Sequence, residues 1–255
     1  MLLDAWRLAL GTLTAVRVPP PEQVDRRVAG MAMVLAPLAA VPLGAAVTLV
    51  GLLGHWLDLS VWVTALLAVG ALVLGNRAFH LDGLSDTVDG LASSFDAERS
   101  LAVMKTGTSG PAGVAATVLV IGLQTAGLAA LFGRADWWQA AILGGVAVCV
   151  SRAALVICCA RGVRPAREDG LGRTFTQTVP RSVAAISWLL VTVVLAAVGA
   201  WAGFPWWRGV FTAVLALVAV GVIVSRAVRR FGGVTGDVFG AAVELALVAI
   251  LVGLS

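Results

Sequence analysis

The stretch SVWVTALLAVGALVLGNRAF at residues 60–79 runs directly into HLDGLSDTVDG at residues 80–90. The first part is mostly apolar and has about the 20 residues that a helix needs to cross a bilayer core. The second part places Asp82, Asp86 and Asp89 at positions i, i+4 and i+7. Because residues at this spacing share a helical face, we expect a membrane-spanning helix followed by an acidic helix.

The composition predicts the same class for the rest of the chain. Of the 255 residues, 60% are hydrophobic and only 13% are charged, and the mean hydropathy is +0.97. These values exclude an ordinary soluble domain and predict an all-α, polytopic membrane helix bundle, with residues 1–255 forming one integral membrane domain. A weakly amphipathic segment, residues 2–16, is expected at the membrane interface or against the bundle. About seven spans are expected, near residues 28–54, 60–79, 111–133, 137–160, 182–202, 206–225 and 238–254.

The distribution of charge predicts the orientation of the bundle. If the N-terminus is cytoplasmic, all of the 18 Lys and Arg residues except Arg134 and Arg208 fall on the cytoplasmic side, as the positive-inside rule requires. All of the 14 acidic residues except Asp58 and Asp136 fall there too. We therefore expect a cytoplasmic active site in a multi-pass protein of the plasma or inner membrane. Membrane topology also explains the net charge of +4, so no nucleic-acid partner is expected.

The three aspartates of residues 80–90 predict a cation site. Like charges on one helical face repel, and Mg²⁺ takes oxygen ligands while leaving positions for a phosphate substrate. The alternative is a solvated acidic helix end. His80 stands beside these carboxylates as a candidate base, ligand or hydrogen-bond partner to phosphate.

Three further segments carry candidate residues. Lys105, Gly107 and Gly110 belong to a glycine-rich loop before an apolar span, which suits an anion but is also typical of helix capping. Arg167 and Glu168 belong to a basic loop in which arginine side chains are expected to bind phosphate. Arg152, on the preceding helix, is expected to reach the same surface, since it would otherwise be costly to bury. Thr235, Asp237 and Glu244 lie at or near the start of the last span, and Asp237 and Glu244 share a helical face. An ionisable residue as deep as Glu244 is a functional candidate by default, with pairing to an arginine as the alternative.

Taken in order along the chain, these motifs resemble the cobalamin synthase family, also called adenosylcobinamide-GDP ribazoletransferase or cobalamin-5′-phosphate synthase. The resemblance covers nearly the whole chain. Its matching segments are residues 80–90, Met104-Lys105 with the following glycines, Ser151-Arg152, residues 166–172, residues 233–237 and residues 240–244, with a looser match at residues 12–19. One segment departs from the family pattern: Thr106-Gly107-Thr108 stands where many members carry Asp-Ser-Arg.

The resemblance implies a magnesium-dependent transferase that joins adenosylcobinamide-GDP to α-ribazole or its 5′-phosphate and releases GMP. It implies Asp82, Asp86 and Asp89 as Mg²⁺ ligands, with Asp237 and Glu244 completing this or a second metal site. It leaves open a homo-oligomer or a complex with other cobalamin-assembly enzymes. Two other classes stay open. A CDP-alcohol phosphotransferase would carry a further spaced aspartate run, and a secondary transporter would favour internal repeats.

Overall fold

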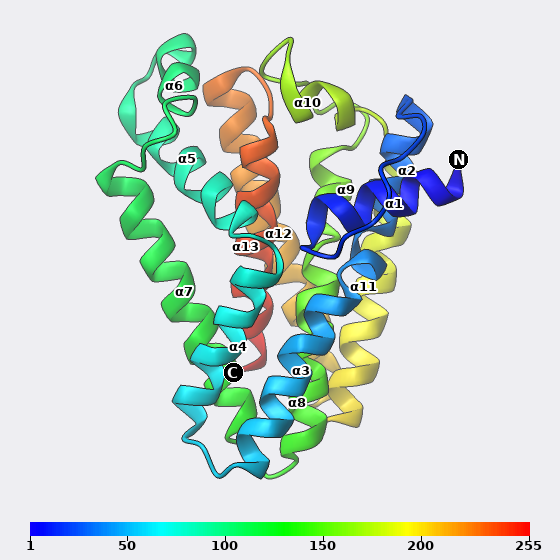
Figure 1. Ribbon diagram of the computed structural model, residues 1–255, viewed down its shortest axis with the longest axis vertical. Coiled ribbons are helices and arrows are strands. Elements are labelled where there is room, and N and C mark those ends of the chain that lie inside the picture. Colours follow the sequence, from blue (N-terminus) through cyan, green and yellow to red (C-terminus); the bar gives the residue numbers. More distant parts are fainter.

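The computed structural model describes all 255 residues, and it is helical throughout, without a β-sheet. The predicted all-α membrane bundle is confirmed. Figure 1 shows the helices running roughly parallel to the long axis, with short helices gathered at one end. The bounds of the helices that cover the N-terminal half are α1 Leu2–Leu13, α2 Arg26–Ala39, α3 Val41–Trp56, α4 Val61–Gly75, α5 Phe79–Ser93, α6 Ala97–Val103 and α7 Pro111–Phe132. Those of the C-terminal half are α8 Trp137–Ser151, α9 Ala154–Cys158, α10 Gly170–Phe175, α11 Arg181–Trp201, α12 Trp206–Phe231 and α13 Gly236–Leu254.

Six helical stretches are long and apolar enough to cross a membrane, and the bent pair α4 and α5 makes a seventh if it counts as one span. The six match the predicted spans to within a few residues, except that α12 continues six residues beyond the expected end at 225. The first stretch breaks at Ala40, between α2 and α3. Pro37 and Pro42 flank this break, and each removes a backbone donor from the helix.

A sharp bend separates α4 from α5. The apolar helix ends at Gly75, and α5 leaves at an angle of 88°. Arg77 and Ala78 form the corner in the left-handed region, with φ of 59° and 56°, which costs free energy in residues other than glycine. Two contacts hold the corner against α1: Arg77 Nη2 donates to the Gly11 carbonyl at 2.9 Å, and the Ala15 amide donates to the Gly75 carbonyl at 2.6 Å. The acidic helix is thereby directed across the bundle.

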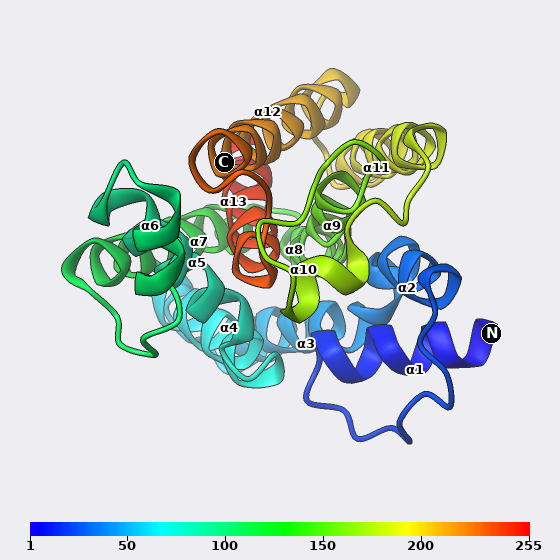
Figure 2. The ribbon, with the colours of Figure 1, turned by 90° about the horizontal axis from the view of Figure 1, so that it is seen from above.

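The last helix, α13, occupies the centre of the bundle. It packs against α5, α7, α8, α9 and α12, and the view from above shows it enclosed by its neighbours (Figure 2). Two glycines allow α5 to approach it closely. A Cβ added at Gly83 would lie 2.7 Å from the Asp237 carbonyl oxygen, and one added at Gly240 would lie 2.7 Å from the His80 carbonyl oxygen. The acidic helix is therefore in backbone contact with the start of α13.

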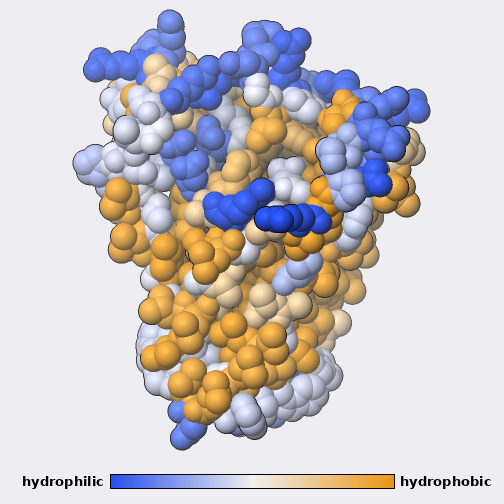
Figure 3. All heavy atoms as spheres, viewed as in Figure 1, coloured by the Kyte–Doolittle hydropathy of each residue, from blue (hydrophilic) through white to orange (hydrophobic).

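Polar side chains gather at one end of the molecule. Figure 3 shows hydrophilic residues over the end where α6, α10 and the N-terminal segment lie, above a broad hydrophobic surface. We call the first region the polar end. α1 packs on α2 and buries Ala5, Ala9 and Leu10 against the bundle. The three cysteines are free, and Cys158 and Cys159 are buried among the apolar residues of the bundle.

Candidate active site

The three aspartates of α5 differ in environment. Asp82 is exposed, Asp86 is half-buried and Asp89 is buried. Asp86 stands within electrostatic reach of three other carboxylates, those of Asp82, Asp89 and Asp237. The predicted acidic helix is therefore present, and a fourth acid reaches it from α13.

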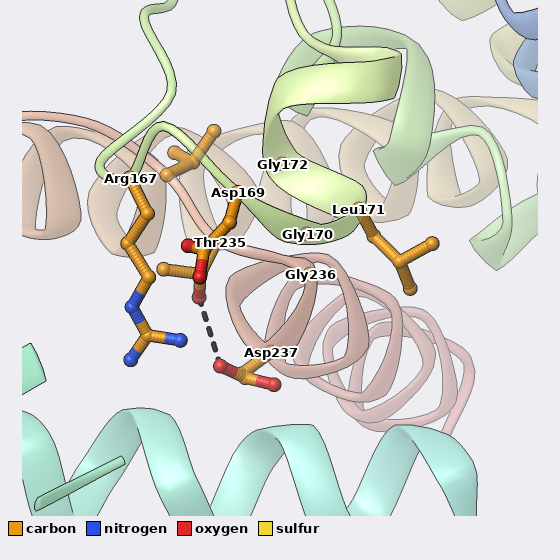
Figure 4. Close-up of a pocket in the computed structure, with 9 residues that line it drawn as sticks. Arg167, Asp169, Gly170, Leu171, Gly172, Thr235, Gly236 and Asp237 are labelled. Carbon is orange, nitrogen blue, oxygen red and sulfur yellow. Dashed lines mark hydrogen bonds between the residues drawn. The ribbon is translucent and has the colours of Figure 1, made fainter. Parts of the chain in front are cut away.

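Asp237 owes its position to the start of α13. Thr235 is the N-cap residue, and its hydroxyl accepts a hydrogen bond from the Val238 amide at 3.4 Å. The same hydroxyl donates to Asp237 Oδ2 at 3.1 Å. Figure 4 shows this hydrogen bond and shows the Asp237 carboxylate turned toward the turquoise helix, α5. Thr235 thus fixes both the first turn of α13 and the direction of the Asp237 side chain.

A pocket of about 180 Å³ opens at this point. Its walls are the α10 segment and the start of α13, and it is lined by Arg167, Asp169, Gly170, Leu171, Gly172, Val234, Thr235, Gly236 and Asp237. Gly172 lets the two walls meet, since an added Cβ would lie 2.8 Å from the Val234 carbonyl oxygen. Three glycines and one threonine line this pocket. Because glycine has no side chain, a phosphate can approach the main chain there.

Arg167 supplies the positive charge of this pocket. Its Nη2 donates to the Leu101 carbonyl of α6 at 2.6 Å, while its buried Nε has no partner. Figure 4 shows the guanidinium on the same side as the Asp237 carboxylate and directed toward α5. The anchored arginine keeps donors available for a further anion.

The glycine-rich loop is tied to Asp89. The Gly110 amide donates to Asp89 Oδ2 at 2.6 Å, and the Gly113 amide donates to Oδ1 at 2.8 Å. Both amides lie at the start of α7, where unpaired N–H groups favour an anion. The anion at this helix start is therefore the protein's own carboxylate, and the Gly110 amide that we expected to meet a phosphate already has a partner.

Lys105 and Gly107 lie on the exposed part of the same loop. Lys105 Nζ lies 3.1 Å from Asp169 Oδ2, and this interaction holds the pKa of the Asp169 carboxyl below its ordinary value. The ion pair joins the glycine-rich loop to the rim of the pocket, although such an exposed pair contributes little to stability. Glu168, on the neighbouring turn, is exposed and pairs with Arg173 at 3.3 Å.

A second polar cluster lies deeper in the bundle. Glu244 Oε2 accepts a hydrogen bond from Gln124 Nε2 at 2.5 Å, and Glu244 Oε1 lies 3.8 Å from His80 Nδ1. Arg152 is fully buried, donates to the Val148 carbonyl at 2.8 Å and acts electrostatically on Glu244. Asn76, at the α4–α5 corner, lies 3.5 Å from His80 Nδ1. We call Asn76, His80, Gln124, Arg152 and Glu244 the buried cluster; it joins residues of five different segments.

Apart from Asp89, Glu168 and the glycine-rich loop residues described above, the predicted site residues fall into two groups. Asp82, Asp86, Arg167, Thr235 and Asp237 lie together at the polar end. His80, Arg152 and Glu244 belong to the buried cluster, and none of them lines the pocket. Sequence reasoning missed Gln124, although a lone amide within an apolar span is a usable signal because it needs a partner there. It also missed the Leu101 carbonyl, which only the tertiary fold brings to the site.

This arrangement suits a substrate that carries phosphate. Carboxylates from α5 and α13 supply hard oxygen donors for a divalent cation, and Arg167 supplies a donor for phosphate oxygens. No group of three or more His, Cys, Asp or Glu side chains is arranged to hold a metal ion on its own. Mg²⁺ sites that act on phosphates often use one or two carboxylates and complete the shell with water and substrate oxygens. Fold and site together define a polytopic membrane protein with an acidic, phosphate-compatible site at one end of its helix bundle.

Comparison with known proteins assigns the family. Residues 5–255 match the cobalamin-5-phosphate synthase family, and the chain belongs to it. A Nocardioides protein named adenosylcobinamide-GDP ribazoletransferase is 53% identical over 248 residues, which cover 97% of this chain and 96% of that protein. Proteins of the same name from Pseudomonas putida and Escherichia coli are 32% and 34% identical, covering 100% and 75% of this chain and 99% and 74% of theirs. No solved structure matches the chain.

Proposed function

We propose that this protein joins adenosylcobinamide-GDP to α-ribazole, or to α-ribazole 5′-phosphate, and releases GMP with adenosylcobalamin or its 5′-phosphate. Family membership and the names of its relatives support the reaction. The observation that carries the site assignment is the contact of α5 with α13, which brings Asp82 and Asp86 to Asp237 beside Arg167.

The chemistry requires that a ribose hydroxyl form a new P–O bond to the phosphorus attached to cobinamide. The bond from that phosphorus to the bridging oxygen breaks, and the oxygen leaves with GMP. Such a phosphoryl transfer depends on positioning and charge neutralisation more than on covalent help. A bound Mg²⁺ would neutralise charge on the diphosphate, and we assign one or two of the Asp82, Asp86 and Asp237 carboxylates to hold it, with water and substrate oxygens completing the shell.

The remaining residues of the polar end orient the substrate. Arg167, held by Leu101, is assigned to a phosphate oxygen of the diphosphate, and Lys105 adds a second cation at the rim. Gly172 and Gly236 have no side chains, so the diphosphate can approach the backbone at these positions. The hydroxyl proton is assigned to a carboxylate of α5 that does not hold the cation, for which Asp82 is the exposed candidate.

The residues of the buried cluster take a positioning role in this proposal. His80 and Glu244 are each 2% exposed, and Arg152 is 0% exposed. His80 lies in the first turn of α5 and Glu244 lies in the middle of α13, so we assign the buried cluster to positioning α5 relative to α13. Asp89 similarly fixes α5 relative to α7 through the Gly110 and Gly113 amides.

The proposal places this chemistry on the cytoplasmic side of the plasma or inner membrane. The cations at the polar end support that orientation through the positive-inside rule, and phosphorylated nucleotide substrates are made in the cytoplasm. Reporter proteins fused separately to the N-terminus and to the short segment at Trp137 would show on which side of the membrane each end of the bundle lies.

The direct test is GMP release from adenosylcobinamide-GDP by the purified protein in detergent with Mg²⁺ and each form of ribazole. We expect release that requires the ribazole acceptor, with a cobalamin product of matching mass. An absence of GMP with both acceptors, from a protein that remains folded, contradicts the proposed function.

A further inference from the structure

The end of α12 carries a separate, basic pocket. It measures about 390 Å³ and is lined by Leu91, Phe95, Arg226, Arg229 and Arg230. No acidic residue lines it, and none of the ion pairs of the protein involves these arginines. Three cations therefore face one hollow without a counter-ion from the chain.

Arg230 is held in place by two contacts, so this part of the pocket has a defined shape. Arg230 Nη2 donates to the Leu91 carbonyl at 3.0 Å, and its guanidinium carbon lies 4.1 Å from the centroid of the Phe95 ring. Phe95 itself is 92% exposed. Such exposure is unfavourable in water for a large aromatic ring, but it is typical of residues at the membrane interface.

The other two arginines continue a lipid-facing stripe of α12. Phe211, Val214, Val218 and Val222 recur every three or four residues along this helix, and each is more than half exposed. Arg226 and Arg229 follow at the same spacing and are also exposed. Since residues at this spacing share a helical face, both arginines stand on the face that the bilayer covers.

The length of α12 places these arginines at headgroup level. Its 26 residues span about 39 Å at 1.5 Å per residue, compared with about 30 Å for the hydrocarbon core. Trp206 and Trp207 are exposed at the opposite end, where aromatic residues mark the other interface. Arg226 lies about 6 Å beyond Val222 along the helix axis.

We propose that this pocket binds the phosphate of an anionic phospholipid, whose acyl chain lies along the apolar stripe of α12. Arginine side chains pair well with phosphate oxygens, and basic pockets at the ends of membrane helices are suited to anionic headgroups. The positive-inside requirement alone needs cations near this end of α12 but does not need them in one acid-free pocket beside an exposed aromatic ring.

Native mass spectrometry of the purified protein tests this proposal. The protein in detergent is mixed with equal amounts of phosphatidylglycerol and phosphatidylcholine, and the retained lipid is counted. We expect the wild type to retain phosphatidylglycerol preferentially, and the Arg226→Gln/Arg229→Gln variant to lose about 10- to 30-fold of that preference, since each arginine contributes about fivefold.

The matched control is Arg17→Gln/Arg161→Gln, which removes two other exposed arginines and should retain the wild-type preference. GMP release in a zwitterionic detergent, with unchanged melting temperature, verifies that each variant is folded. Equal retention of the two lipids by the wild type, or equal loss in the control, contradicts the proposal. Displacement of the lipid by GMP, with the same dependence on Arg226 and Arg229, would instead make the pocket a nucleotide site.

Discussion

Gly83 of α5 lies directly against the backbone of Asp237, so that an added Cβ would stand 2.7 Å from the Asp237 carbonyl oxygen. This contact joins the acidic helix to the first turn of α13. It brings the carboxylates of Asp82 and Asp86 within electrostatic reach of Asp237, which lines the pocket and lies about 150 residues away in the sequence. The candidate active site can form only where these two helices approach each other closely.

Enlarging Gly83 should therefore separate the two halves of the site. We expect Gly83→Ala to cost about 1–3 kcal/mol of stability, as in other overpacked contacts, and to lower the rate of GMP release at least tenfold. Melting temperature and activity in detergent measure the two effects. Gly122→Ala on α7 is the control, because nothing lies within 4 Å of its added Cβ; equal behaviour of the two variants would argue against a tight α5–α13 contact.

Asp89 is expected to act on the start of α7. Replacing it by Asn removes the charge that the Gly110 and Gly113 amides meet, at a cost of about 1 kcal/mol, typical of a lost helix cap. Limited proteolysis should then cut more readily within residues 105–110. Asp136→Asn is the matched control, since Asp136 begins α8 without a side-chain cap hydrogen bond. A variant with wild-type stability but an altered Mg²⁺ requirement would make Asp89 a metal ligand instead.

Removing one charge from the buried cluster should lower the stability of the protein. Glu244→Gln removes the carboxylate that acts electrostatically on the buried guanidinium of Arg152, and a buried charge that loses such compensation destabilises the folded state. We expect a clear fall in melting temperature, whereas Glu98→Gln at an exposed position of α6 should have little effect. The double variant Glu244→Gln/Arg152→Gln should regain part of the stability. If it is no more stable than the single variant, Arg152 and Glu244 do not compensate each other.

Most of the fold could be predicted from the sequence because membrane helices are encoded locally. A run of about 20 apolar residues, such as 182–202, specifies its own span, and α11 at Arg181–Trp201 agrees with it. The bend between α4 and α5 could not be predicted in this way. Its corner residues, Arg77 and Ala78, have no intrinsic preference for positive φ and are held there by contacts with the Gly11–Ala15 region.

The candidate site could be predicted only as a set of residue types. The spacing of Asp82, Asp86 and Asp89 predicted a helix, but it could not show that Asp89 turns to the α7 amides while Asp237 approaches Asp86. Likewise, the sequence could not show whether Arg152, at the end of a span, reaches the same surface as Arg167. Tertiary packing buries Arg152 beside Glu244 and brings Arg167 into the pocket.

The central claim is that carboxylates of α5 hold Mg²⁺ for the diphosphate of the substrate. The most direct test is GMP release by Asp86→Asn as a function of Mg²⁺ concentration, compared with the wild type and with Glu98→Gln. We predict that Asp86→Asn keeps its melting temperature but loses at least 100-fold in turnover, with any residual activity shifted to higher Mg²⁺. Turnover within about twofold of the wild type, at the same Mg²⁺ dependence, would contradict the account.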